Sequence, residues 1–381
     1  MLVPSPDGIN NQGVAMAQVD LFQRLYPEII VKIYGHMSDL GDVKATLSTC
    51  KKAKGIFEEH VNTIAKAHIL RILGPQDYKF AVMAVASREV DPTDQSSVEG
   101  FFRKYLETEK WPASYFTMNI ANTLPLLQSY ADLLTEYAFN TWIPYGDMNE
   151  NEYTRQINTM FMVETAVNLF HKMPGDGQDF DFFWRAPLEE WEEKYWFMFS
   201  ACELGQVVHV GFQFFEVLHY AVNEQHSRRC RLCVACDYGL PNHLNANNDV
   251  RRDPIPAALA YCVGLDELFH WARYGNPCLR INGMYEELHE ALSNNDAEVK
   301  RHCLIGVAEH CMKMQDPSRG RFRPDSQAID EVTWQSFMAD NGKGFSNFFA
   351  CSGAGDDFAG GVACWDMSTV MEYGEWMRRM G

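Results

Sequence analysis

Three evenly spaced cysteines are the first residues of this chain whose types and spacing could support metal chemistry. Cys230, Cys233 and Cys236 stand in the run CRLCVAC, between His226 and His243. Two overlapping Cys-x-x-Cys steps and a histidine could supply a tetrahedral Cys3His zinc site. However, no second Cys-x-x-Cys pair follows at the usual distance, and the same spacing suits one face of a packed helix. We therefore interpret the cysteines as structural, with zinc binding as the alternative.

A Glu-x-x-His pair occurs three times, each time in a stretch with a helical pattern. At this spacing the carboxylate and the imidazole share one helix face, and di-iron helical bundles combine two such pairs with two further glutamates. The first pair stands among three phenylalanines, which favours packing in a core. We expect no bound metal, no cofactor and no catalytic residue, with a helical metal-dependent enzyme as the alternative. The pairs are Glu216/His219, Glu267/His270 and Glu286/His289.

Acidic and aromatic side chains alternate between Asp176 and Trp196. Carboxylates can steer a basic peptide towards such a surface, and aromatic rings can anchor it. The same pattern also fits a solvated helix face above buried aromatic rings, and this interpretation stays open. If the segment binds a target, the candidate residues are Trp184, Glu189, Glu190, Trp191, Glu192 and Glu193.

The elements that must position these residues are predominantly helices. Apolar residues recur at helical spacing along most of the chain, alternating strand patterns are scarce, and no repeat of fixed period is found. We therefore predict an all-α, mainly helical protein, with an N-terminal three-helix module followed by a larger helical domain without recognisable repeats.

Turn-forming residues predict the borders of these parts. Gly74 and Pro75 are expected to end a helix, and the polar run at 91–100 is the best domain boundary. The expected parts are a flexible N-terminus (1–20), the module (21–74), a connecting helix and linker (75–97) and the helical domain that would bind a substrate (98–381).

Composition limits the classes of partner. The net charge is −18 over 381 residues, which argues against nucleic acid and against an anionic membrane surface, because both need a basic face. The first twenty residues are polar and unlike a signal peptide. Eleven scattered cysteines, an odd number, favour a reducing compartment over a disulfide framework. We expect a cytoplasmic or nuclear protein, or one found in both places.

The sequence of the N-terminal module predicts three short helices. Pro27 suits the first turn of a helix, where a missing N–H costs nothing, and Glu28 favours the positive end of the helix dipole. The apolar residues that follow keep helical spacing and share one face. They are Ile30, Ile33, Tyr34 and Met37 in the first helix and Leu40, Val43 and Leu47 in the second.

This ordered set resembles the F-box, a compact helical module that docks on the Skp-type adaptor of cullin ubiquitin ligases. The resemblance covers residues 21–70 and is most similar to F-box proteins of filamentous fungi. One departure is Tyr26, which stands where the family usually has proline, with Pro27 one place later. The matching positions are Leu25, Glu28, Ile29, Ile33, Asp39, Leu40, Asp42, Val43, Thr49, Cys50, Lys51 and Phe57.

The resemblance implies a substrate adaptor that binds a Skp-type protein and brings a protein target to the ubiquitin ligase, with no chemistry of its own. Two alternatives remain: an F-box-like interaction protein with no ligase role, and a helical hairpin that merely opens an all-helical domain. The residues that the resemblance implies for adaptor binding are Leu25, Pro27, Ile29, Ile30, Ile33, Leu40, Val43 and Leu47.

Overall fold

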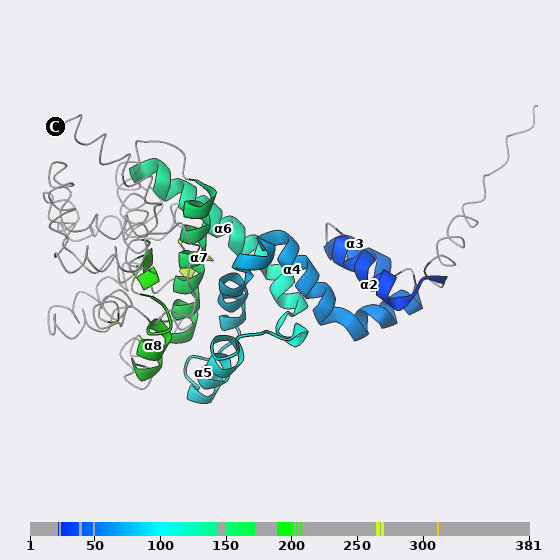
Figure 1. Cartoon of the computed structure of the whole chain (residues 1–381), viewed down its shortest axis with the longest axis horizontal. Coiled ribbons are helices and arrows are strands. Elements are labelled where there is room, and N and C mark those ends of the chain that lie inside the picture. Colours follow the sequence, from blue (N-terminus) through cyan, green and yellow to red (C-terminus); the bar gives the residue numbers. More distant parts are fainter. Residues whose placement is uncertain are drawn as a thin grey trace, which may run out of the picture. The chain divides into compact units, whose positions relative to one another are not determined.

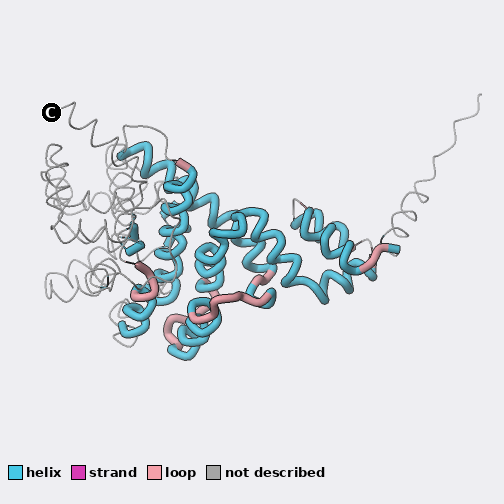
Figure 2. Tube along the Cα trace, viewed as in Figure 1, coloured by secondary structure: helices cyan, strands magenta, loops and turns pink. Residues whose placement is uncertain are grey.

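Every regular element in the described part of the protein is a helix, and the figures show no strand there (Figure 1, Figure 2). The prediction of an all-α fold is thereby confirmed. The computed structural model describes residues 22, 24–37, 40–48, 50–142, 149–171 and 189–200, together with 203, 204, 206, 207, 210, 264–266, 268, 269 and 311.

The chain divides into two compact units. Unit 1 comprises Met1–Val82 and Lys104–Pro125, and unit 2 comprises Met83–Arg103 and Leu126–Gly381. Two long helices pass from one unit into the other. The elements are α2 (Pro27–His36), α3 (Leu40–Leu47), α4 (Lys51–Ser87), α5 (Gln95–Phe101), the π-helix η1 (Phe102–Leu106), the 3-10 helix η2 (Ala113–Tyr115), α6 (Met118–Trp142), α7 (Glu150–Ala166), the π-helix η3 (Val167–His171) and α8 (Glu189–Trp196).

Helix α4 continues without a break through Gly74 and Pro75. The expectation that a helix ends at this step was therefore wrong. A proline inside a helix removes one N–H donor and is locally unfavourable, but packing along the rest of the helix outweighs that local preference. Ile64 and Ile69 are fully buried before the step, and Ala81 and Val82 are fully buried after it.

The polar run at 91–100 contains a turn and the start of a helix. The carboxylate of Asp91 accepts hydrogen bonds from both the backbone N–H and the hydroxyl of Thr93. Asp94 then caps α5, accepting from the backbone N–H of Ser96 at 3.0 Å. Such a cap satisfies a donor that a helix start leaves open. The structure places this run and α5 in unit 2.

Helix α7 is buried along most of its length. It begins with a capping box, in which the Asn149 side chain accepts from the backbone N–H of Glu152 and the Glu152 carboxylate accepts from that of Asn149. Twelve of its residues are buried, polar ones among them. A helix that is buried around most of its circumference lies inside a core.

An ion-pair network centred on Glu164 of α7 holds unit 2 together. Glu164 is buried and accepts hydrogen bonds from Nε and Nη2 of Arg88, at 3.0 and 2.7 Å. Its other oxygen accepts from the backbone N–H of Leu265 at 2.7 Å. The neighbouring Gly264 has φ +75°, and a Cβ atom there would lie 2.9 Å from this carboxylate. A glycine is therefore required for both conformation and space.

Candidate functional site

Helix α2 begins as its sequence predicts. Tyr26 is the N-cap residue in an extended conformation, and Pro27 occupies the first turn, where its missing N–H costs nothing. Glu28 also lies in the first turn, next to the positive end of the helix dipole. The start of α2 is therefore fixed by local chemistry.

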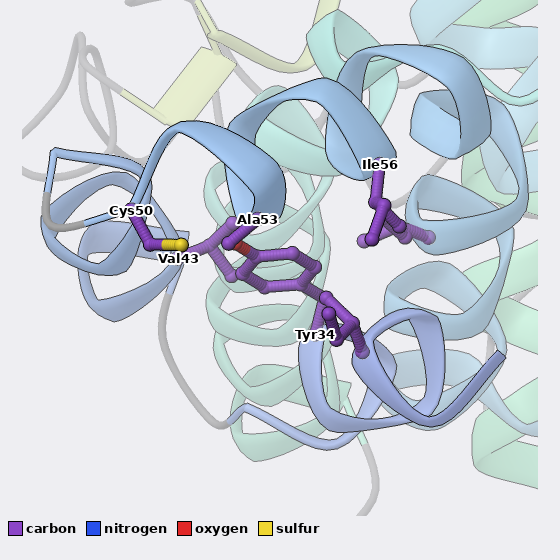
Figure 3. Close-up of a cluster of buried hydrophobic side chains, with 7 residues drawn as sticks. Tyr34, Val43, Cys50, Ala53 and Ile56 are labelled. Atoms are coloured by element: carbon purple, nitrogen blue, oxygen red, sulfur yellow. The ribbon is translucent and has the colours of Figure 1, made fainter. Parts of the chain in front are cut away.

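A small apolar core joins α2, α3 and the first turns of α4. Figure 3 shows Tyr34 of α2 pointing towards Val43 of α3 and Ala53 of α4. The ring of Tyr34 also meets that of Phe57 edge to face, with 5.6 Å between the centroids. The buried members of this core are Ile30, Tyr34, Val43, Cys50, Ala53, Ile56 and Ile64.

Three side chains of α4 bind backbone carbonyls at the two ends of α2. Lys52 donates to the carbonyl oxygen of Leu25 at 2.9 Å, just before the helix. At the other end, His68 Nε2 bonds the carbonyl oxygen of Tyr34 at 2.8 Å, and Arg71 Nη1 donates to that of Met37. The last carbonyls of a helix lack their usual N–H partner; the Tyr34 carbonyl accepts from the Met37 N–H at 3.3 Å as well as bonding His68. Together the three side-chain bonds hold α2 against α4.

His68 is held as a neutral imidazole. A carbonyl can only accept and a guanidinium can only donate, so Nε2 carries the hydrogen and Nδ1 accepts from Arg71 Nη2 at 2.9 Å. Burial lowers the pKa of His68 below its ordinary 6.5. The hydrogen bond to the Tyr34 carbonyl raises this pKa in part, and the positive charge of Arg71 lowers it further.

The structure divides the residues predicted for adaptor binding into three groups. Pro27 and Ile29 are exposed at the start of α2, with Ile29 41% exposed. Ile30 and Val43 are buried within the module's own core, so a docked protein would not reach them in this conformation. The half-buried ones are Leu25, Ile33, Leu40 and Leu47, three of which, Leu25, Leu40 and Leu47, also pack on the core.

An apolar surface remains at the start of α2. Tyr26 is 76% exposed and stands directly before Pro27 and close to Ile29 in the chain. The bond between Lys52 and the Leu25 carbonyl fixes the backbone beneath these side chains. We call Tyr26, Pro27 and Ile29 the α2 surface. In the sequence, Tyr26 is a departure from the family pattern, and its exposure is a feature that residue spacing could not reveal.

Helix α8 carries part of the acidic and aromatic segment. Trp191 meets Phe102 edge to face, with 5.0 Å between centroids, and Lys194 lies over the Trp191 ring at 4.4 Å. Glu192 is buried and accepts from Nε1 of Trp196 at 3.3 Å. Glu190 is exposed and Glu193 is half-buried. Trp184 lies outside the described residues, and for Glu189 only the backbone is described.

The aromatic rings of α8 form part of the unit 2 core. Tyr195 and Trp196 are fully buried, and the Tyr195 hydroxyl donates to the carbonyl oxygen of Met162 at 2.9 Å. The carboxylates of α8 act on Cys311 as well: burial, then Glu193 and Glu192, raise the pKa of this thiol to about 12. In the described part of the segment, 189–196, the aromatic rings are therefore packed and few carboxylates are exposed to solvent.

The residues that could bind a metal in the alternative interpretations lie outside the described residues. This holds for the cysteines at 230, 233 and 236 and for the three Glu-x-x-His pairs. Among the residues that the structure does describe, no group of three or more His, Cys, Asp and Glu side chains could hold a metal ion. None of the described helices is long and apolar enough to cross a membrane.

Comparison with known proteins adds no relative. Neither the family models, nor the curated proteins, nor the solved structures contain a match to this chain. The geometry of the helices and the residues themselves therefore carry the functional argument.

Proposed function

We propose that this protein is an F-box-type substrate adaptor, which binds a Skp-type protein through its N-terminal module and brings a protein target to a cullin ubiquitin ligase. The observation that carries the proposal is the α2 surface. Its apolar side chains stand exposed on a helix whose residues resemble the adaptor-binding helix of the F-box. A soluble domain gains free energy by covering such side chains, at about 25 cal/mol per Å² of apolar area.

The α2 surface is rigid enough to support binding. Lys52, His68 and Arg71 hold both ends of α2, so docking on it would order little additional backbone. Binding to a preorganised surface avoids part of the entropy cost of association. In this proposal Tyr26, which stands where the family usually has proline, contacts the adaptor. Its large aromatic ring offers more contact area than a proline at the same place.

The target would bind to the remainder of the chain, where the negative charge is concentrated. Residues 1–82 and 104–125 contain eleven Lys and Arg against ten Asp and Glu, whereas the rest of the chain contains 22 against 41. Such a field attracts basic partners and repels acidic ones. A basic protein segment is therefore the class of target that suits unit 2.

The proposal is tested by mixing the purified full-length chain with a purified Skp-type adaptor and following their co-elution in gel filtration. Co-elution at equal amounts supports the adaptor function, and independent elution rejects it. A complex that forms but neither joins a cullin nor supports ubiquitin transfer to co-purified proteins would favour the F-box-like interaction protein with no ligase role.

A further inference from the structure

Five aromatic side chains of unit 1 form a cluster away from the core of the N-terminal module. Trp111 is its centre and lies within 5.4–6.4 Å, between ring centroids, of each of the other four. Trp111 and Phe116 are buried, whereas Tyr78 and Tyr115 are half-buried and reach the surface. The five members are Tyr78, Tyr105, Trp111, Tyr115 and Phe116, and we call them the Trp111 cluster.

Hydrogen bonds fix the chain segment that supplies most of these rings. Trp111 Nε1 donates to the carbonyl oxygen of Tyr105 at 3.2 Å. Lys79 Nζ donates to the carbonyl oxygen of Glu109 at 3.1 Å, which attaches the same segment to α4. Loops held by a rigid scaffold are frequent binding elements. The Trp111 cluster is thus a fixed surface on a connecting segment.

Three lysines lie over the rings of this cluster. Lys66 Nζ is 5.0 Å from the Phe116 centroid, and Lys79 Nζ is 5.6 Å from that of Trp111. Lys104 Nζ lies 4.7 Å from the Tyr105 centroid and 5.2 Å from that of Tyr115. All three side chains are half-buried. A cation over a ring face is attracted by the negative face of the ring.

These lysines belong to unit 1, which contains eleven Lys and Arg against ten Asp and Glu, in a chain where acids outnumber bases by 51 to 33. Among the described residues, the only recorded partners of Lys66 and Lys104 are aromatic rings, and no carboxylate forms an ion pair with either. Lys66 and Lys104 therefore keep their capacity to bind an anion.

We propose that the Trp111 cluster with its three lysines binds an acidic segment of a partner protein. Ammonium groups attract and orient carboxylates, and the accessible edges of Tyr78 and Tyr115 supply apolar area for the stems of the bound side chains. A nucleic acid fits less well, because the chain's charge of −18 would repel a long polyanion.

This surface is independent of the proposed adaptor binding. It uses residues of α4 and of the 104–116 segment, whereas the α2 surface uses Tyr26, Pro27 and Ile29. The protein would therefore have two separate protein contacts within unit 1. Loss of acidic-peptide binding should leave binding of the Skp-type adaptor unchanged, so the two proposals can fail separately.

The test is fluorescence anisotropy of a short labelled oligoglutamate peptide titrated with the full-length chain. Lys66→Gln with Lys104→Gln should weaken binding by at least about tenfold, or about 1.4 kcal/mol. The matched control, Lys44→Gln with Lys54→Gln, removes the same charge from exposed lysines of unit 1 and should change the affinity by less than about twofold. Lys66→Arg with Lys104→Arg keeps charge and ring contact, and should keep most of the affinity.

Three results would overturn the proposal. One is no binding of the peptide by the wild-type chain at low salt, where charge attraction is strongest. Another is an equal loss in both glutamine pairs, which would indicate diffuse charge and no site. The third is tighter binding of a single-stranded oligonucleotide through the same lysines, which would make the surface a nucleic-acid site.

Discussion

His68 of α4 donates a hydrogen bond from Nε2 to the carbonyl oxygen of Tyr34, at the end of α2, over 2.8 Å and across 34 residues of sequence. The same ring accepts from Arg71 through Nδ1. This one side chain therefore couples two helices of the module and does so only in its neutral form, because a protonated ring would face Arg71 with a second positive charge.

The contribution of His68 to stability should depend on pH. Its pKa is lowered in the folded protein below the ordinary 6.5, so the unfolded chain binds the proton more tightly. The stabilisation is therefore complete above pH about 6.5 and is lost as the pH falls towards the folded pKa. Urea unfolding of the wild type and of His68→Gln should give a difference in unfolding free energy that shrinks between pH 7.5 and pH 5. A constant or growing difference would contradict this account.

Tyr34 carries a buried hydroxyl that has no hydrogen-bond partner among the described residues. Removing an unsatisfied buried group should cost nothing or stabilise the fold. We expect Tyr34→Phe to leave the urea midpoint unchanged or to raise the unfolding free energy by up to about 1 kcal/mol. Tyr34→Ala leaves a cavity and should lower the unfolding free energy by about 3–5 kcal/mol. A large loss in Tyr34→Phe would mean that the hydroxyl has a partner.

Glu164 should be among the most sensitive residues of unit 2. Glu164→Ala leaves the Leu265 N–H without its acceptor and leaves Arg88 with Asp266 alone, so the cost should be up to about 3–5 kcal/mol, the cost of breaking a buried pair. Glu58→Ala is the control, since it breaks the exposed pair with Lys54 and should change the unfolding free energy by less than about 1 kcal/mol. Similar costs for both variants, measured by thermal melting, would refute the central role of Glu164.

The chain should contain no stoichiometric metal. The cysteine trio lacks a second Cys-x-x-Cys pair and has the spacing of one packed helix face, and the first Glu-x-x-His pair stands among three phenylalanines. Elemental analysis of protein purified without chelator is expected to show much less than one zinc or iron per chain, and EDTA should leave the melting temperature unchanged. One bound metal per chain would instead favour the helical metal-dependent enzyme.

Local signals allowed the start of the module to be predicted from sequence. Pro27 and Glu28 act on the first turn of α2 through backbone geometry and the helix dipole, and helical spacing placed Ile30 and Tyr34 on one face. Both are fully buried. These effects depend on residues within one or two turns, which a single sequence shows directly.

Long-range packing determines the features of the fold that could not be predicted from the sequence. Helical spacing puts Ile29 and Ile30 on different faces of α2, but it does not show that the module's own core covers the face of Ile30. The continuity of α4 through Pro75 depends on packing along the rest of the helix. Likewise, Glu192 is one of four acids between residues 189 and 193, yet its side chain is buried and accepts a hydrogen bond from Trp196. In each case the outcome depends on neighbours outside the local pattern.

The most direct test of the adaptor proposal is the affinity of a Skp-type adaptor for two matched variants, measured by isothermal titration calorimetry. Ile29→Glu and Ile72→Glu make the same change at residues that are 41% and 40% exposed, both in unit 1, but only Ile29 belongs to the α2 surface. Burying an unpaired carboxylate in a contact is costly. We predict a Kd at least about tenfold weaker for Ile29→Glu and unchanged for Ile72→Glu. Equal affinities for the wild type and both variants, or no binding by the wild type, would contradict the account.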